Sequence, residues 1–166
     1  MKKLKLKGRL WLKSFHVFFA AAWIGGAISL IVLPLVSIYL VKNPNYTHAI
    51  NLAIKFIDIF VTIPAAIGSI ITGFMLSLLT NWGFFKHKWV TLKWIITSVV
   101  ILVGAIWIGP WISDLIQMSA SPGFNRLENQ TYQATENKYI FLHTSQTLLL
   151  IYLVFMSIFK PWKKAK

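Results

Sequence analysis

Four long runs of apolar residues dominate the pattern of this chain, and shorter polar segments separate them. The runs cover residues of about 11–41, 56–80, 89–112 and 139–159. A transmembrane helix needs about 20 predominantly apolar residues, so each run is long enough to cross a bilayer. None of them alternates apolar and polar residues as a half-buried strand does. The pattern therefore predicts an all-α fold, a four-span transmembrane antiparallel helix bundle that forms a single membrane domain.

The segment between the third and fourth runs is polar, but most of its residues are compatible with a helix. Only the stretch from Ser119 to Asn125, which contains a proline and a glycine, has the residues of a clear break. We therefore expect a helical extension outside the membrane over about 113–138. Asn125 or Ser121 is expected to cap the second arm of this extension.

Two of the runs carry small and polar residues at helical spacing. In the first run one face is formed by His16, Ala20, Trp23 and Ala27. An ionisable side chain at membrane depth is costly without a partner or ligand, so this face should point toward protein rather than lipid. In the second run a seam of small residues is formed by Ala65, Ser69 and Gly73. Such a seam allows another helix to approach closely.

Composition excludes several classes of protein. Hydrophobic residues make up 57% of the 166 and charged residues only 13%, which is not the composition of an ordinary soluble domain. The chain has no cysteine, so disulfides, thiolate metal sites and cysteine nucleophiles are excluded. It also lacks a phosphate-binding glycine loop, a His-Glu-x-x-His zinc motif and a serine–histidine–acid set.

The net charge of +13 is distributed unevenly along the chain. One side of a four-span bundle would receive Lys2, Lys3, Lys5, Lys7, Arg9, Lys13, Lys86, Lys88, Lys160, Lys163, Lys164 and Lys166. The other side would receive four basic residues, Lys42, Lys55, Arg126 and Lys138, and all four acids, Asp58, Asp114, Glu128 and Glu136. The positive-inside rule then places both termini in the cytoplasm. The basic segments are expected to contact anionic lipid, so nucleic acid is not an expected partner.

The start of the chain also resembles a secretory signal peptide, since a basic segment precedes an apolar stretch and three alanines. The apolar run continues well beyond these alanines, however, and we expect an uncleaved first span.

This topology predicts one group of polar side chains near the cytoplasmic surface. His16 and Lys93 would each lie on the order of 6–8 Å below that surface, at 1.5 Å per helical residue. Their expected neighbours are Trp23, Lys13, Lys88 and His87. A neutral imidazole can ligate haem iron, and lysines can pair with haem propionates. Alternatively, His16 bonds a backbone carbonyl or a threonine hydroxyl, and Lys93 reaches toward the interface.

A second group would lie on the opposite side of the membrane. It consists of Asp58, Lys55, His143 and His48. Lys55 and Asp58 are three residues apart and could form an ion pair, or the group could hold a proton or a metal ion. Because His143 is expected near the external start of the fourth span, most of the ~30 Å hydrocarbon core would separate it from His16. The two histidines are therefore not expected to bind one metal or one haem.

Several short motifs are spread over nearly the whole chain. They are His16-x6-Trp23-x-Gly25-Gly26, Pro64-Ala65 with Thr72-Gly73, Trp82-Gly83-Phe84, Gly109-Pro110 and Lys160-Pro161. In these motifs the chain resembles an uncharacterised family of bacterial four-helix integral membrane proteins. The resemblance implies the same four-span fold and a place in the bacterial cytoplasmic (inner) membrane.

More distantly, the chain is similar to the membrane-bound, haem-containing protoporphyrinogen oxidases and to the copper-resistance D proteins. In the oxidases a first-span histidine and a third-span lysine are functional, and they correspond to His16 and Lys93. The chain departs from the oxidases at Thr91, Leu35 and His143-Thr144, where they have histidine, arginine and Asn-Glu. The resemblance implies haem association at His16 and leaves the oxidase reaction open.

The sequence thus supports a functional hypothesis with two alternatives. The hypothesis is a membrane protein that binds haem b in the cytoplasmic half of the bilayer for redox chemistry or haem handling. His16 would be the axial ligand, and Lys93 a second ligand or a propionate partner. The first alternative is a non-enzymatic module that binds lipid, a small molecule or a partner membrane subunit. The second is a small transporter that works as a homodimer.

Overall fold

The computed structural model describes residues 3–40 and 44–160, and within these residues it contains helices and no strand. The helices are α1 (Leu6–Tyr39), α2 (Pro44–Ile57), η1 (Asp58–Thr62), α3 (Ile63–Leu79), α4 (Lys88–Val103), η2 (Gly104–Ile108), α5 (Gly109–Ser119) and α6 (Gln130–Phe159). The two η segments are π-helical turns. Because α2, η1 and α3 are continuous, as are α4, η2 and α5, the described chain forms four long helices.

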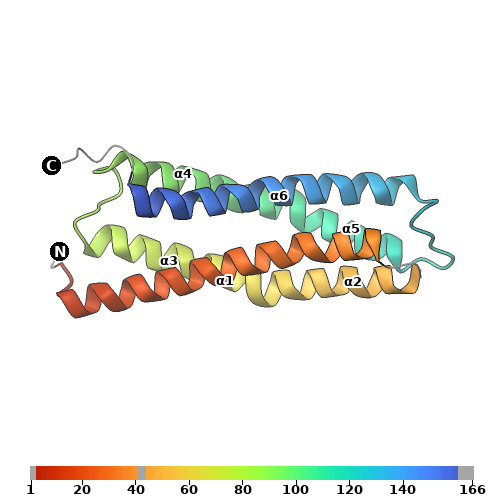
Figure 1. Cartoon of the computed structure of the whole chain (residues 1–166), viewed down its shortest axis with the longest axis horizontal. Helices are drawn as coiled ribbons and strands as arrows, with labels where there is room; N and C mark the ends of the chain where they lie inside the picture. The colour runs from red at the N-terminus through yellow and green to blue at the C-terminus, as the bar shows by residue number, and fades with distance from the viewer. Residues whose placement is uncertain (1–2, 41–43, 161–166) are drawn as a thin grey trace.

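The four long helices run antiparallel, and the start of α1 and the end of α6 lie at the same end of the bundle (Figure 1). We call this the terminal end, and the opposite end, where residues 120–129 connect α5 to α6, the loop end. The predicted all-α four-helix bundle is confirmed. Several predicted features fall on residues 1–2, 41–43 and 161–166 and so lie outside the described residues: the end of the first run at residue 41, Lys2, Lys42, Pro161, Lys163, Lys164 and Lys166.

All four long helices in the described chain are long and apolar enough to cross a membrane. Large hydrophobic side chains remain exposed along the sides of the bundle, among them Phe18, Ile28, Leu102 and Phe155. The protein is therefore a multi-pass integral membrane protein whose outer faces contact lipid. With 34 residues, α1 is about 50 Å long, which exceeds the ~30 Å hydrocarbon core. Part of each helix consequently extends beyond the apolar layer.

The second long helix begins at Pro44, twelve residues before the predicted start of the second run at residue 56. The predicted run marks the apolar part of this helix, and the residues before it are helical although they are not continuously apolar. Its polar residues Thr47 and Asn51 are buried rather than exposed. The amide of Asn51 donates to the backbone carbonyl of Leu115 in α5, so tertiary contacts stabilise a helix that hydropathy does not indicate.

The connection between α5 and α6 covers residues 120–129, which is longer than the break expected from Ser119 to Asn125. The cap of α6 is Asn129, whose side chain accepts a hydrogen bond from the backbone N–H of Tyr132. The predicted caps, Asn125 and Ser121, are both wrong. The side chain of Asn125 instead accepts from the N–H of Leu127 and so shapes the connection itself.

Each π-helical turn ends two residues before a proline, at Pro64 and at Pro110. A proline inside a helix removes one backbone hydrogen bond, and its ring clashes with the carbonyl four residues earlier. A π turn inserts one extra residue and so changes the backbone spacing at that point. The two prolines thus give a local reason for the two irregular turns, which lie near the middle of the second and third long helices.

Most of the buried apolar side chains form two clusters at different heights, and only Leu12, Ala27 and Leu76 of the described residues belong to neither. The terminal-end cluster comprises Trp23, Ala65, Trp89, Val90, Val100, Leu150, Leu153 and Met156. The loop-end cluster comprises Leu30, Ile54, Ile108, Ile112, Leu115, Tyr132 and Tyr139. Each long helix contributes to both clusters. In sequence η1 lies between them, and η2 ends at Ile108, where the loop-end cluster begins in its helix. The core of the bundle is therefore divided into two apolar parts.

The proposed orientation, with the terminal end in the cytoplasm, predicts a labelling pattern. The chain has no cysteine, so single cysteines can be introduced without a background. Leu127→Cys lies at the loop end and Phe85→Cys at the terminal end, and the native side chains are 78% and 87% exposed. A membrane-impermeant thiol reagent should label only Leu127→Cys in intact cells and both variants in lysed cells. Labelling of Phe85→Cys alone in intact cells would reverse the orientation.

Candidate functional site

The face of α1 that carries His16 points toward the bundle, as the spacing predicted. Trp23 and Ala27 are buried, with exposed fractions of 7% and 2%, and His16 is half-buried. The imidazole of His16 lies against α3, where its Nδ1 is 3.1 Å from the carbonyl oxygen of Ser69 and 3.0 Å from Oγ1 of Thr72. The alternative to haem ligation was that His16 bonds a backbone carbonyl or a threonine hydroxyl. The structure contains both of these contacts.

Close packing of α1 on α3 is what brings these groups together. A Cβ atom added at Gly73 would come within 3.2 Å of the His16 ring, and one added at Gly68 would overlap the ring of Phe19. Ala65 and Ser69 on the same side of α3 are buried. The small-residue seam predicted on the second run is thus the surface on which α1 packs, and a side chain at Gly73 would press on the His16 ring.

The hydrogen bonds of His16 determine which ring nitrogen carries the proton. The carbonyl of Ser69 can only accept, so Nδ1 must be the donor. Thr72 uses its own hydroxyl proton toward the carbonyl of Gly68, at 2.6 Å, and can accept from Nδ1 at the same time. Nε2 makes no hydrogen bond to the described residues, so its lone pair is available. A donor bond from one ring nitrogen to a carbonyl is how metal-binding histidines are usually oriented.

The other side chains predicted to lie near His16 at the terminal end do not all contact it. Lys93 is half-buried and donates from Nζ to Oγ of Ser157 in α6, at 2.7 Å. It lies near enough to His16 for its charge to act on the imidazole. The Trp23 side chain belongs to the terminal-end cluster, whereas Lys13 and Lys88 are exposed. His87 stacks on Trp89 rather than contacting His16.

The group predicted on the other side is dispersed in the structure. His48 bonds Oγ of Ser119 through Nδ1, at 3.1 Å, and Lys55 donates to Oγ of Ser113, at 3.4 Å. The ion pair considered for Lys55 and Asp58 is not formed, since the described residues contain one ion pair and it involves other side chains. Nowhere in the described residues do three histidine or acidic side chains gather in a way that could hold a metal ion.

His143 lies deeper than its expected place near the external start of the fourth span. The helix begins at Gln130, so His143 is well inside it, next to the backbone carbonyl of Ala27. Ala27 follows His16 by eleven residues in α1, which corresponds to about 16 Å along the helix axis. The two histidines are closer than predicted but still too far apart to bind one metal ion.

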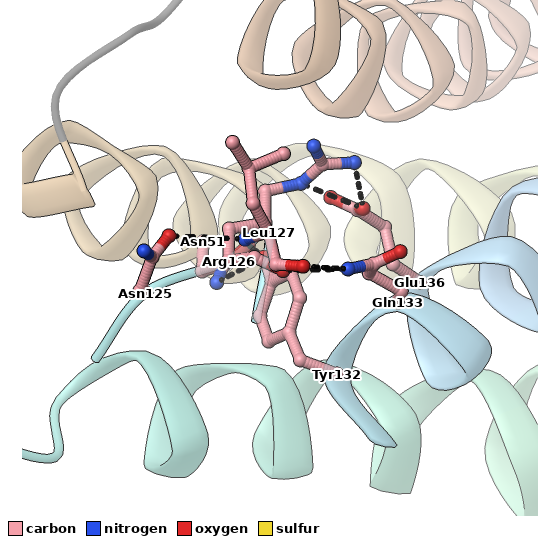
Figure 2. A network of polar contacts seen from close by, with 7 residues as sticks. All are labelled: Asn51, Asn125, Arg126, Leu127, Tyr132, Gln133 and Glu136. Carbon is pink, nitrogen blue, oxygen red and sulfur yellow. Dashed lines mark hydrogen bonds and ion pairs between the residues drawn. The ribbon is translucent and has the colours of Figure 1, made fainter. Parts of the chain in front are cut away.

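A polar network at the loop end was not foreseen from the sequence (Figure 2). The guanidinium of Arg126 donates through Nε and Nη2 to one carboxylate oxygen of Glu136, which is only 2% exposed. The amide of Gln133 donates to the carbonyls of Arg126 and Leu127. Asn51 donates to the hydroxyl of Tyr132, at 3.0 Å, and so joins α2 to α6. No spacing signal reveals this network because its members come from a loop and two helices.

Sequence reasoning also missed the residues that position His16 and Lys93, namely Ser69, Thr72 and Ser157. Serine and threonine in transmembrane helices often bond their own backbone, so their presence alone does not mark a site. Comparison of the chain with protein-family models, with curated proteins and with solved structures found no match. The resemblance described above therefore rests on the quoted motifs.

Proposed function

We propose that this integral membrane protein binds haem b through Nε2 of His16. The observation that carries the proposal is the hydrogen bond of Nδ1 to the carbonyl of Ser69, at 3.1 Å. This bond selects the tautomer with a free Nε2 lone pair, and neutral imidazole is a common axial ligand of haem iron. His16 thus offers the type of nitrogen atom that can bind haem iron.

Lys93 is the second residue of the proposed site. Its ammonium uses one N–H bond for Ser157, which leaves two for a haem propionate, and charge-assisted bonds of this kind are strong. A bound haem would supply one-electron redox chemistry. The chain itself would orient the ligand through Ser69 and Thr72 and keep the site within the bundle. Placement in the bacterial cytoplasmic membrane, with this site in the cytoplasmic half, is part of the proposal.

The test is the absorption spectrum of protein purified from haem-replete cells. The wild-type protein should show a Soret band, and His16→Ala should abolish it because the axial nitrogen is lost. Thr72→Val keeps His16 but removes an oxygen that contacts Nδ1, and we expect haem affinity to fall about 10–100-fold, as for other ligand-orienting residues.

His48→Ala provides a matched control, because it removes an imidazole at the loop end that bonds Ser119. The Soret band should persist in this variant. If the wild type shows no Soret band, or His16→Ala retains it at full intensity, haem binding at His16 is refuted.

A further inference from the structure

A layer of polar side chains separates the two apolar clusters of the core. We call it the central polar layer and define it as Thr62, His143 and Gln146, which are 7%, 6% and 8% exposed. Along α6, Tyr139 belongs to the loop-end cluster and Leu150 to the terminal-end cluster, so His143 and Gln146 lie between them. Thr62 ends η1, just before Ala65 of the terminal-end cluster.

Contacts show that the three side chains lie at one level of the bundle. A Cβ atom added at Gly26 would be 2.7 Å from Oγ1 of Thr62, and His143 is next to the carbonyl of the following residue, Ala27. Oε1 of Gln146 is 3.9 Å from the Cβ position of Gly104, where η2 begins. All four long helices therefore meet at this layer, and both π turns adjoin it.

Four polar atoms of this layer have no hydrogen-bond partner among the described residues. They are Oγ1 of Thr62, both ring nitrogens of His143 and Nε2 of Gln146. The carbonyl of Ala27 is close to the His143 ring but outside hydrogen-bond geometry. Two neighbouring hydroxyls are satisfied, since Thr147 donates to the carbonyl of His143 at 2.9 Å and Thr72 to that of Gly68. The hydroxyl of Ser37, ten residues beyond Ala27 in α1, is a separate unpartnered group. Unpartnered polar groups are costly in a protein surrounded by lipid, so this layer requires an explanation.

The chemistry of the layer indicates what would bind there. It offers the hydroxyl of Thr62, the amide of Gln146 and an imidazole, which together provide both donors and acceptors. No charged side chain of the described residues makes a hydrogen bond or ion pair with any of the three, so neither an inorganic cation nor an anion is matched. Water can both donate and accept, and buried waters typically bond polar groups that have no other partner.

We propose that the central polar layer is a water-binding site in the middle of the membrane, and that His143 exchanges protons with this water. Both π turns adjoin this layer, and such turns are frequent at functional sites. A histidine in contact with water inside a bundle can take up and release a proton, which is the requirement for a proton relay. This site is distinct from His16 and does not depend on haem binding there.

Solid-state NMR of protein labelled with nitrogen-15 and reconstituted in phospholipid vesicles tests the proposal directly. Magnetisation transferred from water should reach the ring nitrogens of His143 several-fold faster than the backbone amides of Leu30 and Leu150, which lie in the two apolar clusters. His143→Phe assigns the ring signals. Transfer to His143 as slow as transfer to the two reference amides would overturn the proposal.

Thermal unfolding in detergent provides a second test. Gln146→Leu and Thr62→Val are close in volume to the native side chains but remove the groups that would hold water. If water bridges these groups, each variant should lower the melting temperature by roughly 2–4 °C. The control is Thr147→Val, which removes a hydroxyl that bonds within α6 and so measures the cost of losing a local hydrogen bond. A melting temperature that rises or stays unchanged in both layer variants would show a dry layer and contradict the proposal.

Discussion

Replacing Arg126 by methionine should lower the free energy of unfolding by about 3 kcal/mol, because it leaves the buried carboxylate of Glu136 without its cation. Glu136 is 2% exposed and Arg126 is its ion-pair partner in the structure. Methionine keeps part of the packing of the arginine stem, so the loss mainly reflects the charge. The measurement is unfolding in mixed detergent micelles, followed by tryptophan fluorescence.

Two further variants separate this effect from a general change in the connection. Glu128→Gln alters an exposed acid that accepts from Asn125 in the same loop, and its effect should stay within about 0.5 kcal/mol. Adding Glu136→Gln to Arg126→Met removes the uncompensated charge and should recover part of the loss. Equal stability of Arg126→Met and the wild type would mean that this ion pair does not hold the loop end together.

Replacing Gly26 by alanine should destabilise the protein by about 1–3 kcal/mol, the usual cost of forcing an extra methyl group into a packed core. The new Cβ would lie 2.7 Å from Oγ1 of Thr62 and 3.6 Å from its Cα, so α1 would have to move away from η1. The same unfolding assay measures the effect.

Gly25, the residue directly before Gly26 in the same helix, provides the matched control, because a Cβ added there meets nothing within 4 Å. Gly25→Ala should be neutral or stabilising by roughly 0.5–1 kcal/mol, the helix-propensity difference between the two residues. Thr62→Ala in the Gly26→Ala background removes the clashing oxygen and should restore part of the stability. The packing explanation fails if both glycine variants have the same stability.

Much of the site around His16 was predictable and some of it was not. Helical spacing placed His16, Trp23 and Ala27 on the inward face, and the small residues of the second run predicted the surface on which α1 packs. The carbonyl that orients His16 and the serine that binds Lys93 could not be predicted, because each pairing depends on the rotation of one helix relative to another. Periodicity fixes a face only to within about one residue, whereas a hydrogen bond requires atoms to lie within a few tenths of an ångström.

The features that the sequence did not indicate at the loop end have a different cause. Hydropathy located the apolar spans and not the helix ends, so it gave no sign of α2, in which Thr47 and Asn51 are buried. The turn and capping residues favoured Asn125 or Ser121 as the cap, although Asn125 bonds within the connection and Asn129 caps α6. In both places polar side chains are satisfied by partners far away in sequence or within an irregular loop, which local patterns do not report.

The sequence by itself determined the class of the protein, because four apolar runs of this length can satisfy their backbone groups in a bilayer only as helices or as a closed barrel, and their pattern is helical. It also determined the grouping of basic segments at one end. The tertiary structure alone decided the neighbours of each polar side chain. It divided the core into two apolar clusters, joined Arg126 to Glu136 and brought Thr62, His143 and Gln146 to one level. These choices depend on helix rotation and on the offsets introduced by two π turns, because a shift of one residue rotates a helix face by about 100°.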